Sequence, residues 1–304
     1  MDITLRQLRL LREVAARGTI AAAAEAHGYT ASAVSQQLSS LEKATGVTVL
    51  ERVGRNVRLT DAGRELVVHA GRLLAGMEEA MASVEQVNQD VRGVLHMSLY
   101  ESVASTLLSP LLGRLADAHP DLELRTRQQD PFPAIEDLAS TALDLAFVID
   151  YPHTPEPHRV DIERMPLLVD RFHLVVAADS PIDAAAVELA SLAEERFVSP
   201  MHGCARSVVM ACRSAGFDPF TAHVHDDYPT ALHLVAGGHG VALVPELGLV
   251  HKPDGVRVIP LVDDVTRNVQ LAFRRASADR PAIRAVCEQA QLVVADLGFT
   301  AAAA

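Results

Sequence analysis

A heptad stripe in the first third of the chain constrains its fold more than any other feature. Apolar residues recur there at alternating spacings of four and three positions, and they are Leu66, Ala70, Leu73, Met77, Ala80, Val84, Val87 and Val91. Thr60 and Asp61 supply a helix start just before the stripe. The sequence therefore predicts one helix from Asp61 to about Asp90, roughly 45 Å long at 1.5 Å per residue. A stripe of this length favours pairing with another helix, most simply the same helix of a second copy. A buried helix within one large domain is the alternative, although no comparable stripe lies nearby in sequence.

The charge of the chain also changes near this helix. The whole chain carries a formal net charge of −12. Residues 1–65 nevertheless hold nine basic side chains against seven acidic ones, which leaves −14 for residues 66–304. A positive head on a negative body is typical of a chain whose one end binds a polyanion. The balance argues against a protein that coats nucleic acid along its whole surface.

Length and cysteine content exclude other classes of protein. The chain has 304 residues, enough for two or more domains, and only three cysteines, Cys204, Cys212 and Cys287. An odd, small number of cysteines does not build a disulfide framework and fits a reducing compartment. The N-terminal residues lack a signal-peptide core, and no apolar run approaches the roughly 20 residues of a membrane span. We therefore expect a cytoplasmic protein that does not enter the membrane.

The sequence carries no recognised motif of an enzyme or a metal site. Its thirteen histidines form neither an HExxH motif nor a Cys/His knuckle, and imidazoles scattered over an acidic surface explain them more simply. A nucleophile elbow, a phosphate-binding loop and a dinucleotide fingerprint are also missing from the sequence. We expect no catalytic residues, no bound metal and no cofactor.

Three helices are expected before the heptad stripe. Helical spacing of apolar residues and capping signals predict helices over Thr4–Arg17, Ile20–His27 and from Thr30 to about Thr45. The second and third are short and are joined by a tight turn that contains Gly28. Two helices joined in this way after a longer one are typical of a helix-turn-helix motif.

The third of these helices has two different faces. Its apolar face would pack on the first two helices, and it consists of Val34, Leu38, Leu41 and Thr45. Small hydroxyl and amide side chains on the opposite face are suited to reading base edges in a major groove. A polar face turned to solvent is the alternative. The predicted contacts with bases or adjacent phosphates are Thr30, Ser32, Ser35, Gln36, Gln37 and Ser39.

An arginine-rich hairpin follows this helix. Short extended stretches at Val47–Glu51 and Val57–Leu59 flank a loop over residues 53–56. Three arginines within seven residues, Arg52, Arg55 and Arg58, are suited to clamping phosphates, which fixes register without reading sequence. A solvated surface hairpin is the alternative. We predict a DNA-binding domain over residues 1–60 and a dimerisation helix over residues 61–91.

Residues 92–304 change to alternating strands and helices. We expect strands at Val94–Leu99, Leu122–Arg127, Leu143–Ile149, Phe172–Ala178, Phe197–Val198, Val224, Val241–Val244 and Val269–Arg274. The expected helices are Val103–Ala118, Pro133–Thr141, Cys204–Ala215, Thr230–Gly237 and Pro281–Leu297. A proline-rich crossover, Tyr151–His158, separates two sets of elements, which predicts an α/β fold of two lobes with a cleft between them. The lobes would comprise about 92–160 plus 266–304, and 161–265.

These features together resemble the LysR-type transcriptional regulators over essentially the whole chain. The resemblance rests on AAEAHGYTASAVSQQLSSLEKATGVTVLER, GRNVRLTDAGRELVVHA, ALDLAFV from Ala142 and LVAGGHGVALVP from Leu234. It implies a winged helix-turn-helix head, a linker-helix homodimer, and a two-lobed effector domain like a periplasmic binding protein. Members of the family are commonly tetramers that bend promoter DNA and change the bend when a small inducer binds. The expected partners are thus double-stranded promoter DNA, a small-molecule effector and further copies of the chain, assembled as a homotetramer.

Some positions depart from the family pattern. The turn has His27 and Tyr29 where the family usually has Leu and a β-branched residue. The recognition helix opens with Ala31 and Ser32 where it usually has Gln followed by Pro or Ser. Losing that Gln removes a bidentate base reader. The operator sequence therefore does not follow from the resemblance.

The effector site is expected where strands meet helix N-termini in the cleft. In two-lobed α/β binders, such junctions offer free N–H groups and a partial positive charge. The candidate contacts are Tyr100, Glu101, Ser102, Gln129, Ser199, His202, Gly203 and Asp226. Helix capping is the alternative role for each of them. A carboxylate of Glu101 facing the cleft would favour an amine-bearing effector.

Cys204 and Cys212 raise the alternative of a regulator gated by thiol oxidation, as in the peroxide-sensing branch of the family. At positions i and i+8 of one helix, their Cα atoms would be about 12 Å apart, beyond the roughly 7 Å limit for a disulfide. The spacing also differs from that of the peroxide-sensing branch, so buried, inert thiols are the favoured interpretation. A cytoplasmic solute-binding protein with a vestigial head is a further alternative, which the stripe and the arginine hairpin disfavour.

Overall fold

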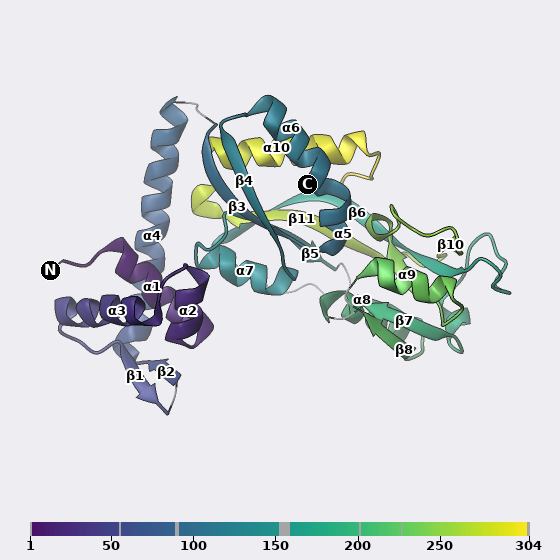
Figure 1. The fold of residues 1–304 in the computed structure, drawn as a ribbon, viewed down its shortest axis with the longest axis horizontal. Helices are drawn as coiled ribbons and strands as arrows, with labels where there is room; N and C mark the ends of the chain where they lie inside the picture. The colour runs from purple at the N-terminus through teal and green to yellow at the C-terminus, as the bar shows by residue number, and fades with distance from the viewer. Residues whose placement is uncertain are drawn as a thin grey trace.

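The computed structural model describes residues 2–54, 56–88, 91–151, 159–200, 202–225 and 227–302, with only the backbone at 88, 200 and 202–206. The predictions for Arg55, Asp226 and most of the crossover, residues 152–158, lie outside the described residues. Figure 1 shows a helical head, one long helix beside it, and a two-part α/β body.

The head folds as the capping pattern predicts. It contains α1 (Leu5–Arg17), α2 (Ile20–Ala26) and α3 (Ala31–Thr45). Thr4, Thr19 and Thr30 each accept a backbone N–H in the first turn of the helix that follows. Gly18 and Gly46 end α1 and α3 with φ values of 74° and 73°, a left-handed conformation that glycine adopts without strain.

The hairpin after α3 begins later than the sequence suggested. Strands β1 (Leu50–Val53) and β2 (Asn56–Leu59) pair antiparallel, whereas we expected the first strand at Val47–Glu51. The Glu42 carboxylate explains the shift because it accepts the N–H groups of Val49 and Leu50 and ties this segment to α3. The hairpin is thereby held beside the end of α3.

Helix α4 (Asp61–Asn88) carries the heptad stripe. One of its sides packs on the head and the body, where Ala70, Leu74 and Ala82 are buried. Leu66 and Ala70 of the stripe pack within the head, whereas the stripe residues from Leu73 to Val87 are open to solvent in the single chain, with Leu73 and Val84 each 57% exposed and Val87 83% exposed. Apolar side chains at this exposure favour a partner helix over the alternative of a helix buried within one domain.

The first lobe is a sheet covered by helices on both faces. It contains β5 (Leu145–Asp150), β3 (Gly93–Leu99) and the edge strand β4 (Leu122–Gln128), with β3 parallel to both neighbours. A helical run forms from α5 (Glu101–Val103), a π-helical segment (Ala104–Leu108) and α6 (Ser109–Ala118). Helices α6 and α10 (Pro281–Asp296) pack together on one face, while α7 (Pro131–Ala139) contacts β5 and β11 on the other (Figure 1).

The second lobe contains β7 (Arg196–Pro200) parallel to β8 (Phe220–His225), with β9 (Ala242–Pro245) and β10 (Val256–Pro260). Helices α8 (His202–Ser214) and α9 (Tyr228–Ala236) pack around them. Short 3-10 turns lie at Leu189–Leu192, Glu246–Gly248 and Arg275–Ser277. Strand β10 was not expected from the sequence.

Two long strands join the lobes. Strand β6 (Ile162–Ala177) pairs with β11 (Thr266–Arg274) along its first part and with β10 and β9 along its last part. The expected start of the second lobe at residue 161 therefore falls ahead of a strand that serves both lobes. We expected only its end, Phe172–Ala178, because Glu163, Arg164, Asp170 and Arg171 make its first part look like a loop.

A buried ion pair lies where β6 and β11 run between the lobes. The guanidinium of Arg267 donates from Nε and Nη2 to Asp170 Oδ2 at 2.9 and 2.7 Å, and both side chains are fully buried. Arg267 Nη2 also donates to Ser102 Oγ at 2.8 Å, and Asp170 Oδ1 accepts the N–H of Leu247 at 3.2 Å. The pair thus joins the helical run of the first lobe to the turn after β9.

Breaking this pair should destabilise the protein strongly. Asp170→Asn leaves the Arg267 charge buried without its counterion, so we expect the free energy of unfolding in urea to fall by about 3–5 kcal/mol. The control is Asp264→Asn, which removes a carboxylate from the exposed pair with Arg171 and should cost about 1 kcal/mol or less. Equal losses in the two variants would contradict the assigned role of Asp170.

Candidate DNA-binding surface and effector cavity

Helix α3 presents its polar face to solvent. Its apolar side chains Val34, Leu38 and Leu41 are buried against the rest of the head. Thr30, Ser32, Ser35, Gln36 and Ser39 are exposed, and Gln37 is half-buried. Thr30 also caps the helix, since its Oγ1 accepts the Ala33 N–H at 3.2 Å. The exposed row of hydroxyl and amide groups leaves one face of α3 chemically able to hydrogen-bond with base edges.

The arginines of the hairpin are not equivalent. Arg52 is exposed on β1, whereas Arg58 on β2 pairs with Glu51 on the facing strand, Nη2 to Oε1 at 2.6 Å. The Glu51 carboxylate offsets part of the Arg58 charge, which the sequence pattern did not indicate. Arg55 lies outside the described residues. Arg52 is therefore the hairpin cation with the better access to a phosphate.

Several polar side chains predicted to contact an effector have partners within the protein. Ser102 is buried and accepts from Arg267. The Tyr100 ring is buried beneath the guanidinium of Arg267, 5.3 Å from ring centroid to Cζ. Gln129 donates from Nε2 to Asp137 Oδ2 at 2.6 Å. The side chains of these three residues are thus engaged with other protein groups.

Glu101 also differs from the expectation of a carboxylate that simply faces the cleft. It is half-buried at the start of α5. Burial raises the pKa of Glu101 and Asp227 adds to the shift, whereas the backbone N–H of Tyr228 at the start of α9 opposes it. Glu101 thus lies near the N-terminus of α9 in the second lobe.

The remaining predicted effector residues lie near the start of α8 or before α9. Ser199 is buried on β7. His202 and Gly203 begin α8, but their side-chain surroundings lie outside the described residues, as does Asp226. No contact of these residues with an effector follows from their positions alone.

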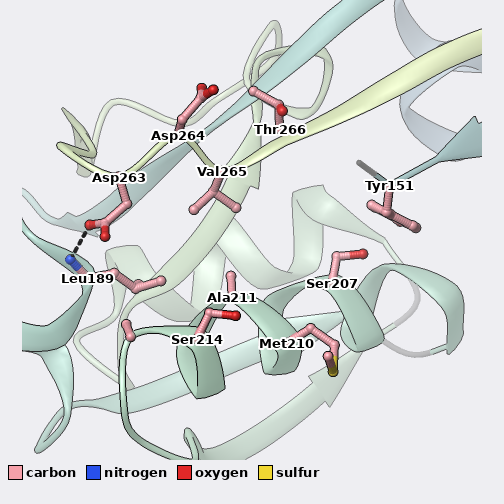
Figure 2. A pocket seen from close by; sticks show the side chains of 11 residues that line it. Tyr151, Leu189, Ser207, Met210, Ala211, Ser214, Asp263, Asp264, Val265 and Thr266 are labelled. Atoms are coloured by element: carbon pink, nitrogen blue, oxygen red, sulfur yellow. Dashed lines mark hydrogen bonds between the residues drawn. The ribbon is translucent and has the colours of Figure 1, made fainter. Parts of the chain in front are cut away.

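A cavity of about 320 Å³ lies between α8 and the loop that leads into β11. Tyr151 and Ser207 lie at one end, and Leu189 and Asp263 at the other, with the hydrogen bond from the Leu189 N–H to Asp263 Oδ2 at 2.6 Å (Figure 2). Its wall is mostly apolar and includes Met210 and Val265. Sequence reasoning missed this set because only the folded lobes bring Tyr151, α8 and residues 263–266 together.

One polar group in the cavity wall lacks a hydrogen bond. Ser207 Oγ is buried and has no partner among the described residues. A buried hydroxyl without a partner costs free energy, which a ligand with a donor or acceptor would recover. The cavity thus combines apolar walls with a few polar groups, the usual composition of a small-molecule site.

The described cysteine thiols are poorly suited to redox sensing. Cys212 on α8 is fully buried, and burial raises its pKa to about 12. Burial likewise raises the pKa of Cys287 on α10 to about 12. Because the thiolate is the reactive form, both groups should react slowly at neutral pH. The Cys204 side chain lies outside the described residues.

Comparisons with known families identify the class of protein. The model for the LysR substrate binding domain matches residues 88–294, and the model for the bacterial regulatory helix-turn-helix protein, lysR family, matches residues 5–64. The chain belongs to the LysR family. It is a DNA-binding transcriptional regulator with an N-terminal helix-turn-helix domain and a two-lobed effector-binding domain, as the sequence motifs implied.

Curated relatives agree with this assignment. The chain is similar to the transcriptional dual regulator GltC of Bacillus subtilis, with 29% identity over 245 residues and 80% of each chain covered. It is 28% identical to the transcriptional dual regulator OxyR of Escherichia coli over 281 residues, which covers 90% of each. A RuBisCO operon transcriptional regulator of Allochromatium vinosum is 32% identical over 207 residues, 67% of this chain and 66% of that one.

Solved LysR structures share the fold. A full-length OxyR variant from Pseudomonas aeruginosa has a TM-score of 0.70 at 23% identity, with 96% of this chain and 98% of that chain covered. Full-length BenM has a TM-score of 0.62 at 23% identity, covering 99% and 100%. LysR regulators bind promoter DNA and small-molecule effectors and form oligomers, and they are regulators rather than enzymes. Among the helices described, none is long and apolar enough to cross a membrane.

Thiol labelling tests the cysteine assignment. We expect Cys212 and Cys287 in the native protein to stay largely unmodified by iodoacetamide at pH 8, because their raised pKa values keep the thiols protonated. Unfolding in urea should expose both to full alkylation, which peptide mass spectrometry would quantify. Native-state labelling of Cys212 as fast as that of free cysteine would contradict the assignment.

Proposed function

We propose that α3 enters the major groove of promoter DNA and that the β1–β2 hairpin holds the adjacent backbone. The observation that carries this proposal is the two-faced packing of α3, which buries its apolar row and leaves its hydroxyl and amide row exposed. The groups proposed to approach bases are Thr30, Ser32, Ser35, Gln36, Gln37 and Ser39. Arg52, Arg55 and Arg58 are proposed to contact phosphates. A regulator that reads chromosomal promoters acts where the DNA is, so we propose a cytoplasmic location.

Two substitutions separate base reading from phosphate contact. Arg52→Ala should weaken binding to every sequence by a similar factor and reduce the salt dependence of log K by about one unit, since one phosphate contact is lost. Gln36→Ala should mainly alter the preference among operator variants. Fluorescence anisotropy against a promoter fragment, point-mutated operators and random DNA measures both effects. Equal losses across all sequences for both variants would refute this division.

We further propose that the exposed stripe of α4 forms the dimer contact and that two dimers assemble into a tetramer. In support, Leu73, Met77 and Val84 expose apolar surface along one side of α4. Burying such a stripe against a second copy removes that surface from water. The proposed division of the chain keeps the head at residues 1–60, this helix at 61–91, and the effector domain at 92–304.

Sedimentation velocity tests the assembly. We expect native protein at micromolar concentration to sediment as a tetramer. The double variant Leu73→Asp/Val84→Asp should sediment as a smaller species, because it places charges within the apolar stripe. Gln86→Glu, an exposed change outside the stripe, should leave the native species intact. A native protein that is strictly monomeric would contradict the proposed contact.

We propose that the cavity beside α8 holds an effector with an apolar body and an amine. The wall supplies apolar contacts from Met210 and Val265, a hydroxyl at Ser207, and the Asp263 carboxylate. Asp263 is a better charge partner than Glu101, because burial raises the Glu101 pKa and favours its neutral form. The amine-bearing effector inferred from the sequence is retained, with a different partner.

Thermal unfolding with a panel of small amines and matched carboxylic acids tests the effector class. Aliphatic or aromatic amines of suitable size should raise the melting temperature by preferential binding to the folded protein. Asp263→Asn keeps the acceptor for the Leu189 N–H but removes the charge, and it should abolish the rise. Asp264→Asn is the matched control, because its carboxylate is turned away from Ser207 and Met210 (Figure 2). Binding by carboxylic acids alone would overturn the proposal.

A further inference from the structure

The DNA-binding head docks directly on the first lobe of the same chain. Arg12 Nη2 on α1 donates to the Ala139 carbonyl oxygen at the end of α7, at 2.7 Å. Arg17, also on α1, donates to Asp137 Oδ1 in the last turn of α7. Figure 1 shows the head beside α7. The contact joins residues more than a hundred positions apart in sequence.

A buried carboxylate on the head strengthens this contact. Glu13 on α1 is fully buried, and its Oε2 accepts a hydrogen bond from Arg17 Nε at 2.7 Å. Burial opposes its ionisation, yet the nearby polar groups of His27, Ser140 and Arg17 outweigh burial and lower the pKa of Glu13, with His27 Nε2 at 3.7 Å from Oε1. Ser140 belongs to the first lobe, at the end of α7. Glu13 and Arg17 of α1 are therefore paired with each other, and Arg12 and Arg17 are hydrogen-bonded to α7.

Asp137 connects the docked head to the end of β4. Its side chain is nearly buried, and Oδ2 accepts from Arg127 Nη2 at 2.5 Å and from Gln129 Nε2 at 2.6 Å, while Oδ1 accepts from Arg17. Gln129 also accepts Arg127 Nε at its Oε1, at 2.9 Å. The Gln129 amide thus fixes both Arg127 and one oxygen of the carboxylate that holds the head.

Gln129 places this network next to the helical run that contacts the second lobe. Gln129 follows β4, and its backbone N–H donates to the Leu99 carbonyl at the end of β3. Tyr100 to Ser102 follow β3 and begin the helical run, whose Thr106 donates to the Leu247 carbonyl oxygen in the second lobe.

We propose that Asp137 is a relay between the cleft and the DNA-binding head. The α1–α7 contact sets the orientation of the head and α4 relative to the first lobe. Withdrawal of the Gln129 amide releases Arg127 and leaves Asp137 less fixed, which loosens its hold on Arg17. The relay rests on the proposed function, since it describes how one part of a ligand-controlled DNA-binding protein influences the other.

Hydrogen exchange on the full-length, DNA-free protein tests the relay without an effector. Gln129→Leu removes a hydrogen bond that holds Asp137, and Asp137 accepts from Arg17 of α1. It should therefore loosen the contact between α1 and α7 and speed amide exchange in α1 by about threefold or more. Arg17→Ala should likewise speed exchange in α7. Glu123→Gln is the matched control, since it removes an exposed carboxylate from β4 that pairs with Arg125, and it should leave α1 unchanged. Unaltered α1 exchange in Gln129→Leu would overturn the relay.

A double-mutant cycle on promoter binding is the second test. Gln129→Leu should change the affinity for a promoter fragment at least about twofold, and the change should disappear in an Asp137→Asn background, because the two residues act through one contact. Additive effects would overturn the relay. Melting temperatures confirm that each variant is folded. The same assay includes Arg52→Ala, so a failure of the relay with normal loss in Arg52→Ala is distinguishable from a failure of the proposed DNA contact.

Discussion

The two-sided packing of α4 is the constraint on which the rest of the structure depends. One side of the helix buries Ala70, Leu74 and Ala82, while the other leaves Leu73, Val84 and Val87 exposed. Two ion pairs attach the same helix to the first lobe, Glu78 with Arg274 and Glu85 with Arg280. The helix thus carries the head, holds it beside the effector domain, and leaves an apolar surface exposed to solvent in the single chain.

Much of the head could be predicted from the sequence because its signals are local. A threonine cap, a helical apolar row and a terminal glycine all belong to one short continuous segment in α1 and in α3, and the structure confirms each. The heptad spacing of α4 is equally local. The start of β1 was wrong because Glu42, seven and eight residues away, takes the backbone N–H groups of Val49 and Leu50.

The effector domain was harder to predict because its important contacts are distant in sequence. The ion pair of Asp170 with Arg267 spans 97 positions, and the link of Arg17 to Asp137 spans 120. No spacing rule connects such pairs. The pattern of polar residues at strand ends did not show that Ser102 and Gln129 would bond to other protein groups.

The cost of burying an unpaired charge explains how charged side chains are arranged in this LysR-family regulator. Buried charged groups are costly unless they are paired. Asp137 and Arg267 each have partners on another element, whereas Glu13 pairs with Arg17 on the same helix, which in turn pairs with Asp137. These pairs join the head to the first lobe and one lobe to the other. Movement of a lobe therefore changes hydrogen bonds at defined residues, whereas the exposed polar face of α3 stays available for DNA.

Footprinting on the DNA upstream of the gene tests the central claim most directly. If paired heads each place α3 in a major groove, native protein should protect two half-sites on one face of the duplex, about one helical turn or a whole number of turns apart. A variant with Asp at Leu73 and Val84 should lose the paired pattern. A native protein that protects no site on this DNA at physiological salt would contradict the account.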